Sequence, residues 1–164
     1  MGKTCCVTGH RDLPAGAETK IRSELRREVL VAIEDGYTHF ISGFASGADL
    51  MFAEIVVGLK DRYPITLEAA IPYPGRMKTP DETFQRLIGS CDVIKVHSER
   101  YFKGCFVRRN RYMVDASQRV IAVYDGRETG GTAATVRYAK RCGRKIDLIT
   151  ITHKIVRGTC DNVN

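Results

Sequence analysis

The chain has 164 residues, of which 43% are hydrophobic and 27% charged, with a formal net charge of +7. This length and hydrophobic content suit one domain with a buried core. The positive charge favours anionic partners such as nucleotides or nucleic acid. No apolar run approaches the ~20 residues that span a bilayer, so a membrane span is excluded and no membrane partner is expected.

The six cysteines follow no CxxC spacing and form no regular framework. Several fall in apolar or helical patterns, which favours reduced thiols in the core of a cytoplasmic protein. These spacings predict no metal site. The amino terminus leads directly into a strand pattern, so we expect no secretion signal and a cytoplasmic location.

Hydrophobic periodicity and turn residues predict strands that alternate with helices along the chain. The predicted strands cover residues 4–8, 39–42, 66–71, 92–97, 119–124 and 145–151. The predicted helices cover residues 17–34, 48–60, 80–89, 106–117 and 132–142. The proline-rich residues 72–76 are predicted to lack regular structure. One domain is therefore expected over residues 1–151, followed by a tail over 152–164 without periodicity.

The alternation predicts an α/β fold of three layers, in which helices cover both faces of a parallel sheet. In such a sheet, all strand-to-helix loops share the carboxyl edge. Nearly all of the glycine-rich and arginine-bearing loops belong to this set, at residues 9–11, 43–47, 72–76, 97–105 and 125–132. Because ligands bind at this edge in open α/β sheets, the sequence predicts the functional site there.

The last of these loops carries Gly130-Gly131-Thr132 between an apolar strand and a helix. Glycines let the backbone approach a ligand closely, and a helix start offers free N–H groups at the positive end of the helix dipole. The pattern predicts an anion-binding site, with phosphate as the favoured anion. An ordinary flexible turn between a strand and a helix would have the same residues.

A second glycine loop, Gly43 to Gly47, includes Ser46 and is followed by Asp49. It can offer backbone donors to a phosphate, while Asp49 either caps the helix or meets a hydroxyl group. No Gly-Lys-Ser/Thr follows, so the loop is not of the Walker type, and no GxGxxG follows the first strand.

Arginines and an asparagine lie at the same edge. Arg11 follows the first strand and can pair with phosphate, although a surface salt bridge is the alternative. Arg109 and Asn110 fall in the first turn of a helix, where arginine opposes the helix dipole and an anionic ligand would relieve the conflict. A solvated charged face is the alternative there. His10 is included as a weaker candidate because a histidine at a turn is commonly structural.

Aromatic and acidic residues of the edge loops are further candidates. Phe44 and Tyr73 either stack on a base or pack within their loops. The acids that could serve a catalytic pair are Asp49, Asp125 and Glu128. No serine elbow, Cys–His pair or metal cluster is recognisable, so the catalytic residues stay unknown.

Five motifs occur in order along the chain: Thr8-Gly9-His10-Arg11, Ser42-Gly43 to Gly47-Ala48-Asp49, Ile71-Pro72-Tyr73, Arg109-Asn110 and Tyr124-Asp125-Gly126 with Gly130-Gly131-Thr132. Together they resemble the SLOG superfamily, and within it the small bacterial YpsA-like proteins related to the DprA/Smf and lonely-guy groups. The resemblance covers about residues 4–151. It implies a Rossmann-like sheet of central order 3-2-1-4-5, with an extra strand expected.

The resemblance also implies that a nucleotide or nucleotide derivative binds at the carboxyl edge, with ADP-ribose, NAD or a nucleotide sugar as examples, and that the chain forms a homodimer. The ligand contacts that the resemblance implies are Gly9, Arg11, Gly43, Gly47, Asp49, Asn110, Gly130, Gly131 and Thr132. The predicted site also includes His10, Ser46 and Arg109. No firm cofactor follows beyond such a nucleotide-type ligand.

One departure from the related groups bears on activity. The lonely-guy phosphoribohydrolases carry Pro-Gly-Gly-x-Gly-Thr-x-x-Glu, and Thr135 stands where that glutamate would fall. The favoured function is therefore a nucleotide-binding or sensor domain. The first alternative is an enzyme that cleaves or transfers at an N-glycosidic bond, and the second is DprA-like binding of single-stranded DNA, for which an aromatic-basic stripe is not evident.

Overall fold

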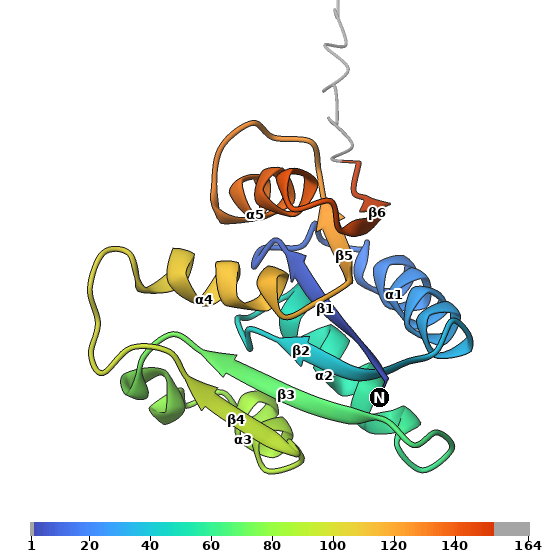
Figure 1. Cartoon of the computed structure of the whole chain (residues 1–164), viewed down its shortest axis with the longest axis horizontal. Coiled ribbons are helices and arrows are strands. Elements are labelled where there is room, and N and C mark those ends of the chain that lie inside the picture. Colours follow the sequence, from blue (N-terminus) through green and yellow to red (C-terminus); the bar gives the residue numbers. More distant parts are fainter. Residues whose placement is uncertain (1, 153–164) are drawn as a thin grey trace, which may run out of the picture.

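The structure is a computed structural model that describes residues 2–152, and these residues form a parallel sheet flanked by helices (Figure 1). The strands are β1 (Lys3–Gly9), β2 (Tyr37–Ser42), β3 (Thr66–Ile71), β4 (Val93–Val96), β5 (Arg119–Tyr124) and β6 (Lys145–Thr150). The α-helices are α1 (Glu18–Glu34), α2 (Ala48–Leu59), α3 (Glu82–Ile88), α4 (Cys105–Asp115) and α5 (Gly131–Arg141). The predicted α/β class is confirmed.

The six strands lie in the order β4-β3-β2-β1-β5-β6, and every neighbouring pair is parallel. The strand β4 pairs with β3 at one edge of the sheet and is the expected extra strand. Without it the order is β3-β2-β1-β5-β6, which is the expected order 3-2-1-4-5 when the five strands are numbered along the chain. The strand β1 is therefore central, and the order reverses on its two sides. This reversal is the point at which open α/β sheets bind ligands.

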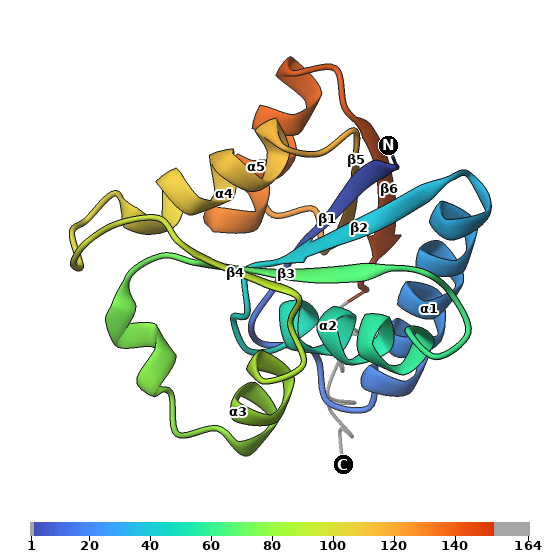
Figure 2. The same cartoon turned by 60° about the horizontal axis from the view of Figure 1, so that its bottom comes forward.

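Helices cover both faces of the sheet, as predicted. Figure 2 shows α1, α2 and α3 on one face and α4 and α5 on the other. Each face of the sheet has its own hydrophobic core, and alternate residues of β1 pack into each of them. Cys5 and Val7 pack with α1, α2 and α3, and Cys6 packs with α4 and α5. A strand that is buried on both faces reads as a continuous apolar run, which explains the pattern at the start of the chain.

The segment after β3 differs from the prediction. Residues 72–76 were expected to lack regular structure, but Pro74–Lys78 forms a short 3₁₀ helix. Proline is compatible with the first turn of a helix, where its missing N–H is not needed. The next helix, α3, begins after Asp81, whose carboxylate accepts a hydrogen bond from Phe84 N at 3.1 Å.

The described cysteines are all free thiols: Cys5, Cys6, Cys91, Cys105 and Cys142. Cys160 and the predicted tail beyond Thr152 lie outside the described residues. Between residues 2 and 152 no three potential metal ligands gather at one place, and no helix is long and apolar enough to cross a membrane.

A cluster of ion pairs around one buried arginine lies at the amino edge of the sheet, opposite the strand-to-helix loops. Arg119, at the start of β5, is 1% exposed, and its guanidinium contacts Asp147 at 2.5 Å and Asp35 at 2.8 Å. Glu28 Oε2 lies 3.8 Å from Arg119 Nη2. The hydrogen bond from Arg119 is the main reason why the pKa of Asp35 is lowered. This cluster joins α1, β5 and β6 far from the carboxyl edge.

Candidate functional site

A cavity of about 290 Å³ opens at the carboxyl end of β1, between the first turns of α4 and α5. Its walls come from four loops or helix starts. The lining residues are Val7, Thr8, Gly9, His10, Arg11, Asp12, Ala45, Asp49, Phe106, Arg109, Asn110, Met113, Arg127, Thr129, Gly130, Gly131 and Thr132. The predicted residues Gly9, His10, Arg11, Asp49, Arg109, Asn110, Gly130, Gly131 and Thr132 therefore come together around one space.

The glycine loop forms the wall of this cavity that belongs to α5. Gly130 has a φ of 100°, a conformation that favours glycine, and α5 starts at the next residue. Gly131 lines the cavity, and a Cβ atom added there would meet nothing within 4 Å, so the space beside this residue is open. The first-turn amides of α5 have no partners within the helix and carry the positive end of its dipole.

The opposite wall is built around Arg109, which is only 4% exposed. Its Nη1 donates to the carbonyl oxygens of Gly43 at 2.6 Å and Ala70 at 3.1 Å. Its Nε donates to Asn110 Oδ1 at 2.8 Å. All three hydrogen-bond acceptors are neutral groups, and the nearby carboxyl group of Asp49 also interacts electrostatically with this buried cation at the edge of the cavity.

Phe106 organises the cationic side chains. The guanidinium carbon of Arg11 lies 5.2 Å from the centre of the Phe106 ring, and that of Arg109 lies 5.8 Å from it. Cation–π attraction of this kind holds arginines against an aromatic face. The ring therefore holds two positive groups, one from the loop after β1 and one from α4, beside the same cavity.

Gly43 supports the site without lining the cavity. A Cβ atom there would lie 2.8 Å from Arg109 Cζ and 2.9 Å from Asp49 Oδ2. Glycine is thus required because the two charged side chains occupy the space that any other residue would fill.

Ser46 and Gly47 line a second cavity of about 290 Å³ on the α1 and α2 side, which shares Arg11 with the first. Gly47 has a φ of 80°, and a Cβ atom there would lie 2.5 Å from the carbonyl oxygen of Arg11. The structure thus separates Gly43, Ser46 and Gly47 from the cavity around which the other predicted residues gather.

Asp49 lines the cavity and is 7% exposed. Its Oδ2 accepts a hydrogen bond from Ala45 N at 3.2 Å, so it holds the glycine loop and does not act as the N-cap of α2, which is Gly47. Burial raises the pKa of Asp49 to about 6, although the positive charges of Arg109 and Arg11 oppose this shift.

His10 links two edge loops. Its Nε2 lies 3.2 Å from Asp125 N and 3.1 Å from Asp125 Oδ1, and one ring nitrogen can serve only one of them at a time. Burial lowers the pKa of His10, which favours the neutral ring that accepts from the amide. Its carbonyl oxygen accepts from Ala48 N at 3.3 Å. The residue therefore positions the loops around the cavity.

The contacts of the other acidic candidates, Asp125 and Glu128, do not indicate a catalytic pair of carboxylates. Asp125 forms an ion pair with Arg127 at 2.6 Å. Glu128 is exposed, and its carbonyl oxygen accepts from Arg137 at 2.8 Å. The hydroxyl of Thr135, at the position of the lonely-guy glutamate, donates to the carbonyl oxygen of Gly131 at 2.8 Å. The hydroxyl of Thr135 is therefore used in a hydrogen bond within α5.

The aromatic candidates are placed differently from one another. Phe44 is 1% exposed and packs edge-on against Phe84, with ring centres 5.6 Å apart, so it is a core residue. Tyr73 packs edge-on against Tyr101 and Phe106.

Sequence reasoning missed Phe106 and Met113. Together with Arg109 and Asn110 they recur every three or four residues along α4, and this spacing defines one face of a helix. That face could have been recognised from the sequence once Arg109 was placed at the ligand edge. The side chains of Arg127 and Thr129 were also missed.

Comparison with known proteins agrees with this architecture. The model of the YspA SLOG family matches residues 5–154. The UPF0398 protein lin2003 of Listeria innocua is 26% identical over 141 residues, which are 78% of each chain. A UPF0398 protein of Bacillus pumilus is 22% identical over 152 residues, 84% of this chain and 82% of that one.

Solved structures with a similar fold include DNA processing protein A (DprA) from Streptococcus pneumoniae, with a TM-score of 0.68 and 19% identity; the match covers 98% of this chain and about half, 54%, of that one. DprA from Helicobacter pylori has a TM-score of 0.67 and 17% identity, over 93% and 67% of the two chains. The protein TM1055 has a TM-score of 0.56 and 15% identity, over 88% and 72%. The family match over nearly the whole described structure shows that the chain belongs to the YspA SLOG family.

Proposed function

We propose that this protein binds a nucleotide or nucleotide derivative, with a phosphate group on the first turn of α5. The observation that carries the proposal is the shared cavity, which joins the start of α5 to a buried arginine of α4. Backbone amides at a helix start and a guanidinium group are two complementary donors for phosphate oxygens.

The neighbouring side chains fit the rest of such a ligand. Asn110 accepts from Arg109 through Oδ1, which leaves its NH₂ group as a further donor. Phe106 and Met113 offer apolar surface to a sugar or base, and Asp49 offers a carboxyl group to a hydroxyl. The volume of about 290 Å³ lies near the lower end of the ~300–1,000 Å³ range of small-molecule sites, so we infer that one nucleotide unit fills it.

The related structures support a phosphate-bearing ligand. DprA from H. pylori binds single-stranded DNA, and its fold is similar to that of this chain over 93% of the chain. Binding without turnover is favoured over N-glycosidic cleavage, because Thr135 supplies no acid and the Oδ2 of Asp49 is engaged by a backbone amide.

The test is a thermal-shift panel of AMP, ADP-ribose, NAD and a nucleotide sugar. A ligand at 100 times its dissociation constant is expected to stabilise the fold by ~2.7 kcal/mol, which is roughly 5–10 °C for this chain length. No shift with any of these ligands at millimolar concentration would contradict the proposal.

A pair of glycine variants separates the site from general stability. Gly131→Val adds a side chain over the proposed phosphate seat, where a Cβ atom meets no neighbour, and it is expected to abolish the ligand-induced shift while the protein still folds. Gly58→Val is the control, because Gly58 is an exposed residue of α2 with equally open surroundings. Retained binding in Gly131→Val would remove the glycine loop from the site.

A further inference from the structure

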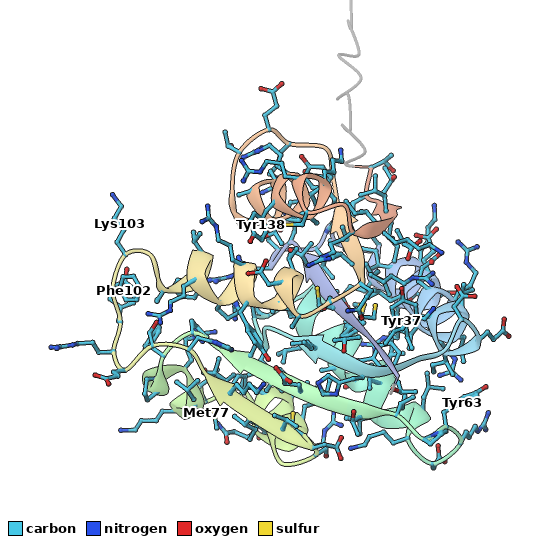
Figure 3. The ribbon with its side chains drawn as sticks, in the orientation of Figure 1. Tyr37, Tyr63, Met77, Phe102, Lys103 and Tyr138 are labelled. Atoms are coloured by element: carbon cyan, nitrogen blue, oxygen red, sulfur yellow. The ribbon has the colours of Figure 1, made fainter. Side chains whose placement is uncertain are left out.

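A groove distinct from the two cavities described above lies between α4 and α5. It has a volume of about 260 Å³ and shares two residues, Asn110 and Gly131, with the cavity at the carboxyl edge. Its other lining residues include Arg111, Arg137 and Arg141, together with Tyr138. The view with side chains shows Tyr138 where α5 lies against α4 (Figure 3). The groove therefore begins where the proposed nucleotide site ends.

Tyr138 holds two of these arginines in place. The guanidinium carbon of Arg111 lies 5.2 Å from the centre of the Tyr138 ring, and that of Arg141 lies 5.8 Å from it. The hydroxyl of Tyr138 donates to Asp115 Oδ1 at 2.6 Å, which fixes the ring. Two cations from two different helices are thus held on one aromatic ring, as Arg11 and Arg109 are held on Phe106.

These positive charges are not neutralised by ion pairs. Within residues 2–152, neither Arg111, Arg137 nor Arg141 forms an ion pair with a carboxylate; Arg137 instead donates to the carbonyl oxygen of Glu128. Three uncompensated guanidinium groups along one groove attract a ligand that carries several negative charges. Docking of a second copy about a twofold axis would bring the same arginines together, and like-charge repulsion opposes that contact.

The direction of the groove indicates an elongated ligand that extends along α5 from the first cavity. Both helices begin at the carboxyl edge of the sheet, and the stretch of α5 from Gly131 to Arg141 spans about 15 Å at ~1.5 Å per residue. A ligand that leaves the first cavity past Gly131 meets Arg137 and then Arg141 along α5, with Arg111 facing them from α4.

We propose that the groove between α4 and α5 binds a phosphate-linked extension of the nucleotide held in the first cavity. This inference rests on the proposed function and adds a second, outer phosphate site to it. The shared chemistry is a phosphodiester-linked nucleotide chain, whose source is either a dinucleotide or a short single strand of nucleic acid. Arginine side chains bind the phosphates of such a chain, and the binding weakens as salt rises because counterions are released.

The test compares AMP, the dinucleotide pApA and a 5′-phosphorylated hexa-adenylate by isothermal titration calorimetry. The variant is Arg111→Gln/Arg141→Gln, which spares Arg137 because that side chain also holds the glycine loop. The control is Lys20→Gln/Arg26→Gln, which removes the same charge from exposed positions of α1 on the other face of the sheet.

We expect the wild-type chain and the control to bind pApA about tenfold or more tightly than AMP, and the groove variant to lose this gain while its affinity for AMP stays within about twofold. The magnitude of the slope of log K against log[salt] for pApA should fall by about 0.7 in the groove variant, at ~0.7 per phosphate contact on single strands, because the one linking phosphate of pApA loses its contact with the groove. A further gain with hexa-adenylate indicates a single strand, and equal affinity indicates a dinucleotide; both support the groove.

Two results would overturn the inference in distinguishable ways. If AMP binds but pApA binds no better, or if the groove variant behaves like the control, the groove assignment fails and the nucleotide site stands. If none of the proteins binds AMP, the proposed function itself fails and the extension fails with it.

Discussion

Arg109 on α4 donates through Nη1 to the carbonyl oxygen of Gly43 at 2.6 Å, and this bond ties α4 to the loop after β2. Arg109 also binds the carbonyl oxygen of Ala70, so one buried side chain sets the position of two strand ends. Glycine at position 43 leaves the space that the guanidinium occupies. The fold and the candidate site therefore depend on the same contact.

Replacing Arg109 with lysine is expected to lower both the stability of the fold and the affinity of the candidate site for its ligand. A lysine ammonium cannot reproduce the planar set of donors that reaches both carbonyl oxygens and Asn110. We expect urea unfolding to report a loss of about 1–3 kcal/mol, and calorimetry to report an affinity for AMP that is about tenfold weaker or more. Arg108→Lys is the control, since Arg108 is exposed and outside the cavity. An effect no larger than that of the control would refute this role.

The raised pKa of Asp49 predicts a pH-dependent stability. The folded chain holds this proton up to about pH 6, whereas the ordinary aspartate value is 3.8. Because the folded state binds the proton more tightly, the free energy of unfolding falls as the pH rises from about 4 to about 6 and then levels off. The buried carboxyl accounts for on the order of 2–3 kcal/mol of this fall.

Asp49→Asn removes this titration while its side-chain oxygen can still accept from Ala45 N. The free energy of unfolding of the variant, minus that of the wild type, is therefore expected to increase between pH 4 and pH 7, as measured by urea unfolding at each pH. Parallel curves for the two proteins would mean that Asp49 keeps an ordinary pKa. ADP-ribose affinity should fall across the same interval in the wild type only, since an ionised Asp49 repels the anionic ligand.

Arg119 provides a test of stability that is separate from the site. Arg119→Met leaves Asp147, Asp35 and Glu28 without their shared cation. Removing one partner of a buried ion pair costs about 3 kcal/mol or more, and we expect a loss near 3 kcal/mol in urea unfolding because the three carboxylates are partly exposed. Nucleotide affinity should not change, since Arg119 lies at the amino edge. A loss below 1 kcal/mol would show that the cluster is not stabilising.

Gly58 offers a stabilising change. It lies in the last turn of α2, is exposed, and has no atom within 4 Å of an added Cβ atom. Gly58→Ala is expected to raise the free energy of unfolding by about 0.5–1 kcal/mol, because alanine has the higher helix propensity and restricts the unfolded chain. A thermal melt of the two proteins measures this directly. An unchanged or lower melting temperature would indicate a contact for Gly58 that the fold does not account for.

The order of elements was predictable because it depends on local patterns. The apolar run of β5 and the helical spacing of α1 place those elements within a few residues of their observed bounds. The edge position of β4 was not predictable from the strand alone, since its residues read much like those of an inner strand. Pairing with β3 is settled by tertiary contacts, which no local pattern records.

The site was predictable in its location and less so in its details. Glycines and arginines at loop positions pointed to one edge of the sheet, and the cavity lies there. The sequence did not distinguish Gly43, which makes room for Arg109, from Gly131, which lines the cavity. It also offered Phe44 as a stacking residue, whereas that ring packs into the core against Phe84. Such differences depend on which neighbour fills a given space.

Hydrogen–deuterium exchange with and without saturating ADP-ribose is the most direct test of the proposed nucleotide site. We expect slower exchange in residues 9–11, 109–110 and 130–132, three of the four segments that line the cavity, with no change in α1. Protection confined to other parts of the chain, or no protection anywhere at saturation, would contradict this expectation.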